Sequence, residues 1–288
     1  ELRAIATELA HVAGDRLADK TTAERAWITV LEVEADASDA FDALSEMYRG
    51  DQRWTDLRAL LERRAEVTLD QQAKYAALLS LAKIEEEMLG DGLRATAAYC
   101  RVLELDASSS DAFHALDRIY SESKQWPELE ALLARRADHV DSAPLQVELA
   151  YRRAELWAHE LKDASRAVDL VEDVIGKHRH HADARELLEE LLTDPKANAV
   201  QMRVARLLEP LYEDDKLWKD LVAVLRAQRA LVGGTEAVEI LARIAVLEET
   251  ELSAARAAFD AWLEVLKLEP AHERARVELG RLAQWLQR

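Results

Sequence analysis

The sequence predicts an all-α protein built from stacked pairs of antiparallel helices. Only 8 Gly and 5 Pro interrupt 288 residues, of which 49% are hydrophobic and 33% charged, a composition typical of long helices joined by short turns. The chain also repeats itself, and its apolar residues recur every three or four positions. At this length, one extended repeat array explains the pattern better than two or three globular domains.

The repeat is clearest between two segments related by a shift of 72 (111 minus 39). The segment that begins at Asp39 and ends at Ala65 aligns without gaps with the segment that begins at Asp111, and 14 of the positions are identical. Each segment carries an apolar stripe, a charged interruption and a second stripe, which is the pattern of a helical hairpin. The shared large residues are Phe41/Phe113, Leu44/Leu116, Tyr48/Tyr120, Trp54/Trp126, Leu57/Leu129 and Leu61/Leu133.

A second kind of hairpin precedes each of these segments. Ala23, Trp27 and Val30 mark it in the first copy, and positions 95, 99 and 102 mark it in the next copy, again with a shift of 72 (95 minus 23). One unit of about 72 residues therefore contains two hairpins, and neither hairpin could bury its apolar face alone.

The register of the repeat changes in the third unit. Tyr212 and Trp218 keep the Tyr–Trp spacing of the earlier pairs, but the shift from Tyr120 predicts this tyrosine at position 192 (120 plus 72), so the offset is 20 (212 minus 192). The turn-forming segment TDPKANA and the helical pattern after it predict an inserted helix at about 193–213. We expect one solenoid over 1–288 with units 1–72, 73–144, 145–233 and 234–288, the last incomplete or capping.

These residues resemble the tetratricopeptide repeat (TPR). Phe41, Leu44 and Tyr48 match the first helix of that motif, and Asp117 departs from it by occupying a small-residue position. The resemblance implies a right-handed α-solenoid whose first helices line a concave groove that captures a partner peptide or domain. The second-helix matches are Ala258, Trp262, Val265 and Pro270.

Groove positions carried over from the family nominate a set of partner-binding residues. Carboxylates among them would favour a basic partner, although solvated helix positions are the competing interpretation. Asp39 and Asp111 precede the apolar stripes and are expected to cap their helices. The groove candidates are Asp42, Glu46, Arg49, His114, Arg118 and Ser121.

Charge and hydropathy exclude two classes of partner. The formal net charge of −18, from 38 Lys and Arg against 56 Asp and Glu, opposes binding to nucleic acid. No apolar run approaches the roughly 18 to 20 residues of a membrane span, so no membrane insertion is expected. The first residues form an amphipathic pattern without a basic start, which indicates no secretory signal. A single cysteine fits a reducing, cytoplasmic location. Frequent Ala, Arg and Leu suggest a bacterial genome rich in GC.

The sequence offers no arrangement for catalysis, a cofactor or a metal. No nucleophile with a base, carboxylate pair or phosphate-binding glycine loop can be assembled, so an enzyme is not expected. Cys100 is the only cysteine, which excludes an internal disulfide and paired-cysteine zinc sites. His178, His180 and His181 lie beside Asp183, but adjacent histidines diverge on a helix, and an exposed turn is the preferred interpretation.

Two functional hypotheses follow. The first is a non-enzymatic scaffold or adaptor that binds a protein partner in the groove. The alternative is a structural module that associates with itself through the ends of the solenoid, or a slice of a larger array. Trp285 on the final helix is the candidate for self-association, because a terminal helix has an unpaired face.

Overall fold

The computed structural model describes residues 1–286, and this part of the chain is all helical. It contains sixteen α-helices, one π-helical turn (η1) and one 3-10 turn (η2) in the described residues, with no strand among them. The predicted all-α array of TPR-like helix pairs is therefore confirmed. Two compact units are distinguished, Glu1–Val140 and a second that begins at Asp141.

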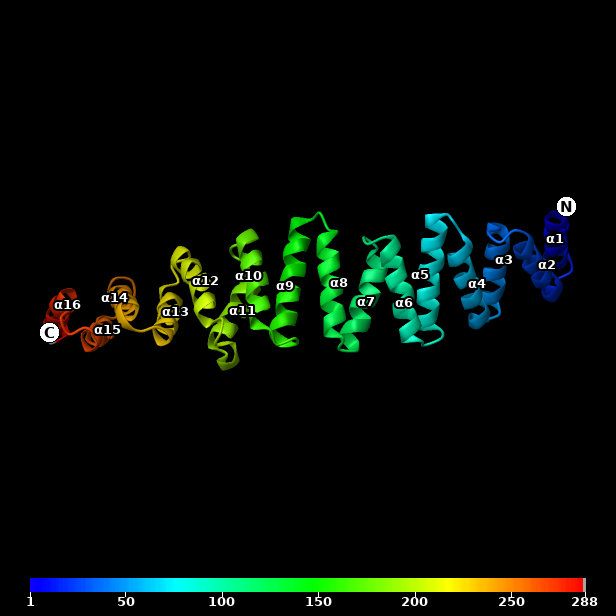
Figure 1. The fold of residues 1–288 in the computed structure, drawn as a ribbon. Coiled ribbons are helices and arrows are strands. Elements are labelled where there is room, and N and C mark those ends of the chain that lie inside the picture. The colour runs from blue at the N-terminus through cyan, green and yellow to red at the C-terminus, as the bar shows by residue number, and fades with distance from the viewer. Residues whose placement is uncertain (287–288) are drawn as a thin grey trace. The chain divides into compact units, whose positions relative to one another are not determined.

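The first unit contains the helices α1 to α8, labelled in Figure 1. Successive helices pack against each other as antiparallel neighbours joined by short turns. The elements are α1 Leu2–His11, η1 Val12–Arg16, α2 Lys20–Val33, α3 Ser38–Gly50, α4 Trp54–Val67, α5 Gln71–Glu87, α6 Gly92–Leu105, α7 Ser110–Glu122 and α8 Trp126–Asp138.

The second unit contains α9 to α16 and the segment where the sequence repeat changes register. The elements are α9 Ala143–His159, α10 Ala164–Lys177, α11 Ala182–Thr193, η2 Pro195–Ala197, α12 Gln201–Asp214, α13 Trp218–Leu231, α14 Gly234–Thr250, α15 Ala255–Leu268 and α16 Glu273–Leu286. The stretch 193–213 thus holds η2 and nearly all of α12. The division of the whole chain into four repeat units stays a prediction.

The Tyr–Trp spacing corresponds to one recurring turn. The carbonyl oxygen of Tyr48 accepts a hydrogen bond from the backbone N–H of Arg53 at 2.8 Å, and Gln52 between them adopts a φ of 57°. A left-handed residue followed by such a bond closes a helix end without leaving its last carbonyls unpaired. The same bond follows Tyr120 and Tyr212, where the left-handed residues are Lys124 and Lys216.

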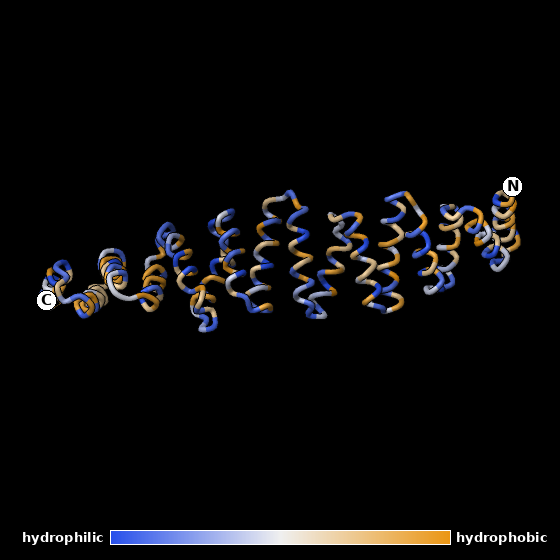
Figure 2. Tube along the Cα trace, in the orientation of Figure 1, coloured by the Kyte–Doolittle hydropathy of each residue, from blue (hydrophilic) through white to orange (hydrophobic). Residues whose placement is uncertain are grey.

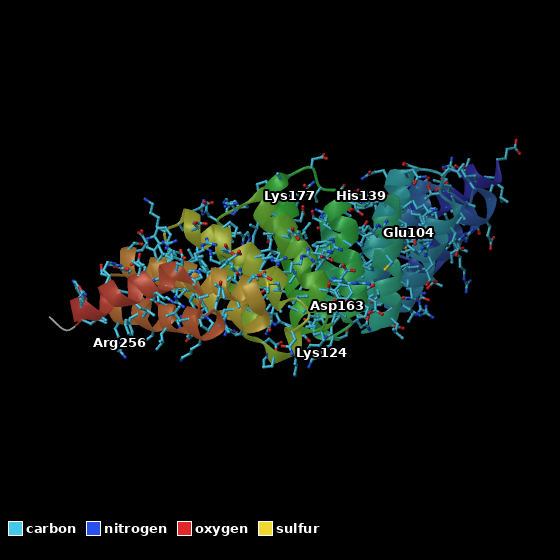
Figure 3. The ribbon with its side chains drawn as sticks, turned by 60° about the vertical axis from the view of Figure 1, so that its left-hand side comes forward. Glu104, Lys124, His139, Asp163, Lys177 and Arg256 are labelled. Carbon is cyan, nitrogen blue, oxygen red and sulfur yellow. The ribbon has the colours of Figure 1, made fainter. Side chains whose placement is uncertain are left out.

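A second turn type ends the first helix of each longer hairpin. The carbonyl oxygen of Glu85 accepts from the N–H of Asp91 at 2.8 Å, with Gly90 in the left-handed region at a φ of 65°. Asp91 then caps α6, because its side chain accepts from the N–H of Arg94. Asp19 and Asp163, at the equivalent positions of the neighbouring copies, play the same two roles, and Figure 3 labels Asp163 at the start of α10.

Asp39 and Asp111 are expected from the sequence to be N-caps and are not, although the Asp39 carboxylate accepts a hydrogen bond from the backbone N–H of Ala40 at 3.0 Å. Helices α3 and α7 begin one residue earlier than either aspartate, and their N-caps are Ala37 and Ser109. Both carboxylates lie in the first helical turn, where a negative charge is still favourable. The side chain of Asp39 accepts a hydrogen bond from Arg3.

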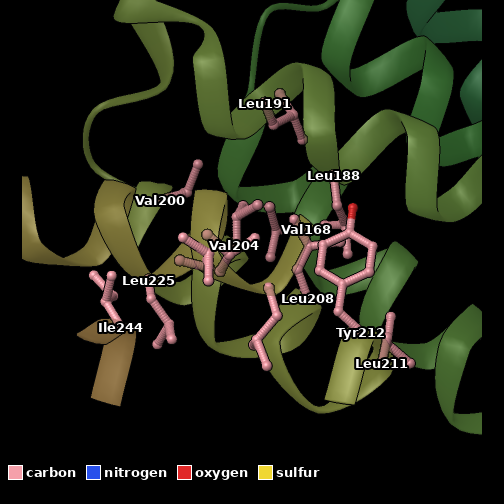
Figure 4. Close-up of a cluster of buried hydrophobic side chains, with 14 of the residues drawn as sticks. Val168, Leu188, Leu191, Val200, Val204, Leu208, Leu211, Tyr212, Leu225 and Ile244 are labelled. Carbon is pink, nitrogen blue, oxygen red and sulfur yellow. The ribbon is translucent and has the colours of Figure 1, made fainter. Parts of the chain in front are cut away.

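Apolar faces of neighbouring helices form the core. Figure 2 shows apolar residues recurring among polar ones along the helices. Burying each large side chain stabilises the fold by roughly 1.5 to 3 kcal/mol. In the first unit, the most deeply buried large side chains include Phe41, Leu44, Leu57, Leu78, Leu116 and Leu133. Figure 4 shows part of the second core, including Val168, Leu188, Val204, Leu208, Tyr212 and Leu225.

A polar cluster joins α2 to the α3–α4 turn. The Tyr48 hydroxyl donates a hydrogen bond to Glu24 at 3.0 Å, and the guanidinium of Arg53 donates two to the same carboxylate at 2.8 and 2.9 Å. Arg53 also lies over the Tyr48 ring at 4.6 Å. The Arg53 hydrogen bond lowers the pKa of Glu24, while burial and the bond to Glu24 raise the pKa of Tyr48 to about 12.

The carboxylate of Glu85 is buried without a hydrogen bond. Its side chain is 1% exposed, and neither oxygen has a hydrogen-bond partner. The guanidiniums of Arg58 and Arg94 lie 3.9 and 4.0 Å away. Burial raises the pKa of Glu85, and the two cations oppose that rise.

Replacing Glu24 by Gln should destabilise the protein at pH 7. The lowered pKa of Glu24 means that its contribution is present above the pKa of the unfolded chain and is lost as pH falls through the folded pKa. We expect the free energy of unfolding to fall by about 1 to 2 kcal/mol at pH 7, and the difference from wild type to shrink in acid. Denaturant titration measures both. Glu32→Gln, an exposed position on the same helix, is the control and should change little.

Replacing Glu85 by Gln should change the free energy of unfolding in the opposite direction to Glu24→Gln. Because the pKa of Glu85 is raised in the fold, ionisation destabilises the folded state as pH rises above the unfolded pKa. We expect Glu85→Gln to raise the free energy of unfolding by up to about 1 kcal/mol at pH 7 and to have no effect below about pH 4. Glu248→Gln is the matched control and should destabilise, because Glu248 accepts a hydrogen bond from Arg226 at 3.1 Å. If Glu85→Gln lowered the free energy of unfolding more at pH 7 than at pH 4, the charge of Glu85 would not be destabilising.

Candidate partner-binding groove

Three of the sequence-predicted residues line one pocket. Asp42, Glu46 and Arg49 lie on successive turns of α3 and face a hollow of about 650 Å³ between α3 and α5. Leu61 and Arg64 of α4 complete the lining between those two helices. Because residues three or four apart share one face of a helix, the spacing of these three side chains explains why they meet in one place.

Small side chains on α5 leave this pocket open. Ala73, Ala76, Ala77 and Ser80 form the wall opposite α3. The equivalent positions of the next copy, reached by the same shift of 72 (145 minus 73), carry larger side chains, namely Leu145, Glu148, Leu149 and Arg152. The wall of small side chains is therefore a feature of the first copy that the next copy lacks. Sequence reasoning missed this wall, although comparison of the two copies contains the signal.

The charges in the pocket are mixed. Arg64 donates a hydrogen bond to Asp42 at 3.0 Å, and its guanidinium lies 5.0 Å from the centre of the Phe41 ring. Arg64 is 17% exposed and Asp42 is 76% exposed, so one partner of the pair is largely buried and the other faces water. Glu46 and Arg49 are exposed, and neither side chain has an ion-pair or hydrogen-bond partner among residues 1–286. Glu46 and Arg49 are thus the charges available to a partner.

The other three candidates lie apart from this pocket on α7. The guanidinium of Arg118 pairs with Glu86 and lies 3.6 Å from Glu122. His114 packs its ring edge-on against Phe113 at 5.4 Å. Ser121 is half-buried. The hollow at α7, about 240 Å³, is lined by Cys100, Leu116 and Tyr120 among others and does not include the three candidates.

The histidine segment forms a helix cap and ring contacts. His181 accepts a hydrogen bond from the N–H of Ala184 at the start of α11 and packs against the rings of Tyr151 and His178 at 5.0 and 5.7 Å. His180 lies 3.4 Å from Asp215. Across the described residues, no group of three or more His, Cys, Asp or Glu side chains is placed to hold a metal ion. These histidines have local structural roles.

Apolar side chains are exposed on the first and last helices. Leu2, Ile5 and Leu9 lie on one face of α1 and are 49 to 64% exposed. Trp285 on α16 is 62% exposed. None of the helices in residues 1–286 is long and apolar enough to cross a membrane.

The recurring turns and the antiparallel helix pairs define the fold. The chain folds as an α-helical repeat array of antiparallel helix pairs. No protein-family model and no curated protein matches the sequence.

Solved structures with a similar fold include TPR proteins at low sequence identity. They include the C-terminal part of a TPR repeat-containing protein from Cytophaga hutchinsonii, with 14% identity, coverage of 97% of this chain and 99% of that chain, and a TM-score of 0.36. A tetratricopeptide repeat protein from Parabacteroides merdae has 13% identity, coverage of 85% and 98%, and a TM-score of 0.36. MamA has 17% identity, coverage of 64% and 95%, and a TM-score of 0.35.

Proposed function

We propose that this TPR-like protein is a scaffold or adaptor that captures a peptide segment of a partner protein in the pocket between α3 and α5. The observation that supports this role is the open hollow lined by Asp42, Glu46 and Arg49, with alanines forming the opposite wall. A wall of small side chains leaves room for an apolar side chain of the partner, and the charges at the rim orient it. The role is binding and not catalysis.

The charges of the pocket define how a partner would be selected. Asp42 is already paired with Arg64, so it adds little attraction for an incoming cation. Glu46 is exposed and unpaired, and it offers the carboxylate that a basic residue of the partner would meet. Exposed pairs of this kind contribute at most about 1 kcal/mol each, so the apolar anchor supplies most of the affinity.

Filling the pocket with Trp should abolish peptide capture. Peptides selected from a random display library on the wild-type protein would be labelled and titrated by fluorescence anisotropy against Ala76→Trp. We expect at least about a tenfold loss of affinity, because the displaced apolar anchor is worth roughly 1.5 to 3 kcal/mol.

The matched control is Ala223→Trp, the same substitution at an exposed position of α13, which should bind like wild type. Equal binding to all three proteins, or a library that yields no peptide above background, would contradict peptide capture at this pocket.

The exposed face of α1 favours self-association as a second candidate. Leu2, Ile5 and Leu9 form a continuous apolar stripe that lacks a neighbouring helix in the described chain. Ile5→Glu should convert any concentration-dependent oligomer to a monomer, as measured by light scattering over a dilution series. A wild-type protein that is monomeric at every concentration would exclude this candidate and leave the adaptor.

A further inference from the structure

A second pocket adjoins the first on the other side of α3. Its volume is about 470 Å³, and it lies between η1, α2 and α3. Glu46 and Gly50 line both pockets, so the two hollows meet at the C-terminal half of α3. The unpaired carboxylate of Glu46 therefore stands at the boundary between two adjacent binding spaces.

The π-turn η1 shapes this second pocket. The backbone N–H of Leu17 bonds to the carbonyl oxygen of Val12 at 3.2 Å, five residues earlier, as in a π-helix. This turn brings His11, Gly14 and Asp15 to the pocket lining. The first helices at the equivalent sequence positions, α5 and α9, instead run for 17 residues as α-helices. π-Turns of this kind are frequently found at functional sites.

The lining combines a short apolar wall with carboxylates. Ala10, Ala23, Ala43, Met47 and Trp27 supply the apolar part. Asp15 and Glu46 supply the carboxylates.

The other charged groups at the second pocket already have partners. The Lys20 ammonium pairs with Asp51. His11 lies 3.4 Å from Asp15 and packs edge-on against Trp27 at 5.1 Å. Glu46 alone among the charged groups of this pocket has no partner in residues 1–286.

We propose that this second pocket receives the side chain of a lysine or arginine of the partner whose neighbouring apolar residue fills the first pocket. The aliphatic stem of such a residue would lie along the alanines and Met47, and its cation would meet Glu46 and Asp15. The inference rests on the proposed function, since it describes the same partner segment. It makes the partner a protein with a basic residue next to an apolar one.

The test uses the full chain labelled with ¹⁵N at glycine. The eight glycines give a small set of amide signals, of which Gly14 reports on the second pocket alone and Gly50 on both pockets, and Gly176 and Gly280 of the second unit serve as references. N-acetyl-lysine N-methylamide is the probe, and N-acetyl-norleucine N-methylamide, which has a similar stem without the charge, is the matched probe. We expect the lysine compound to shift Gly14 and Gly50 in a salt-sensitive titration.

Glu46→Gln should weaken that titration about two- to fivefold, which is the range for one exposed ion pair, and Glu32→Gln should leave it unchanged. Equal shifts with norleucine, no effect of Glu46→Gln, or no shift at Gly14 would each overturn the proposal. Ala76→Trp separates the two hypotheses because its position lines only the first pocket. A lysine titration that persists when no library peptide binds would refute peptide capture alone, and peptide capture without a lysine titration would refute this inference alone.

Discussion

The helices of each unit depend on burying one apolar stripe against the helices that precede and follow them. A single hairpin cannot cover its own stripe, because two helices leave a large part of each face in water. Stacking one hairpin on the next resolves this, and the buried side chains Phe41, Leu44 and Leu57 are the result in the first unit. The turns then have one task, which is to reverse the chain without leaving buried backbone groups unpaired, and two turn types repeated along the chain perform it.

Two carboxylates that lie between helices contribute to the stability of the fold with opposite signs. The charged form of Glu24 is stabilised, because Arg53 and Tyr48 both donate hydrogen bonds to its carboxylate. Glu85 is fully buried with no hydrogen bond to either oxygen, so burial penalises its charged form, although Arg58 and Arg94 lie near it. Both carboxylates lie between helices, and burial together with hydrogen bonding decides whether the charge stabilises the fold or costs free energy. A count of ion pairs would not reveal that difference.

The sequence alone predicts the hairpins and half of the pocket. The Tyr48–Trp54 spacing locates the turn between α3 and α4 because both large side chains mark where an apolar stripe stops and restarts. The three residues of α3 could be nominated because they share a helix face. The small residues of α5 that form the opposite wall could not be nominated, since alanines are common in any helix and do not by themselves indicate a pocket. The N-cap of α3 could not be predicted from the sequence either, because a shift of one residue decides whether Asp39 precedes the helix or lies within it. The π-turn at Gly14 could not be predicted because it does not change the spacing of the apolar residues.

The pocket residues lie at positions where the first two copies of the repeat differ in sequence. Residues that build the fold are shared between the first two copies, as with Phe41 and Phe113, because stacking tolerates little change in volume. Residues in the pocket differ: Glu46 corresponds to Arg118, and small residues of α5 correspond to larger ones of α9. A substitution that does not disturb stacking is free to alter charge and volume at the surface. In the role proposed for this chain, the positions that break the internal symmetry are the ones that would select a partner, and those that line the two pockets lie on both sides of α3.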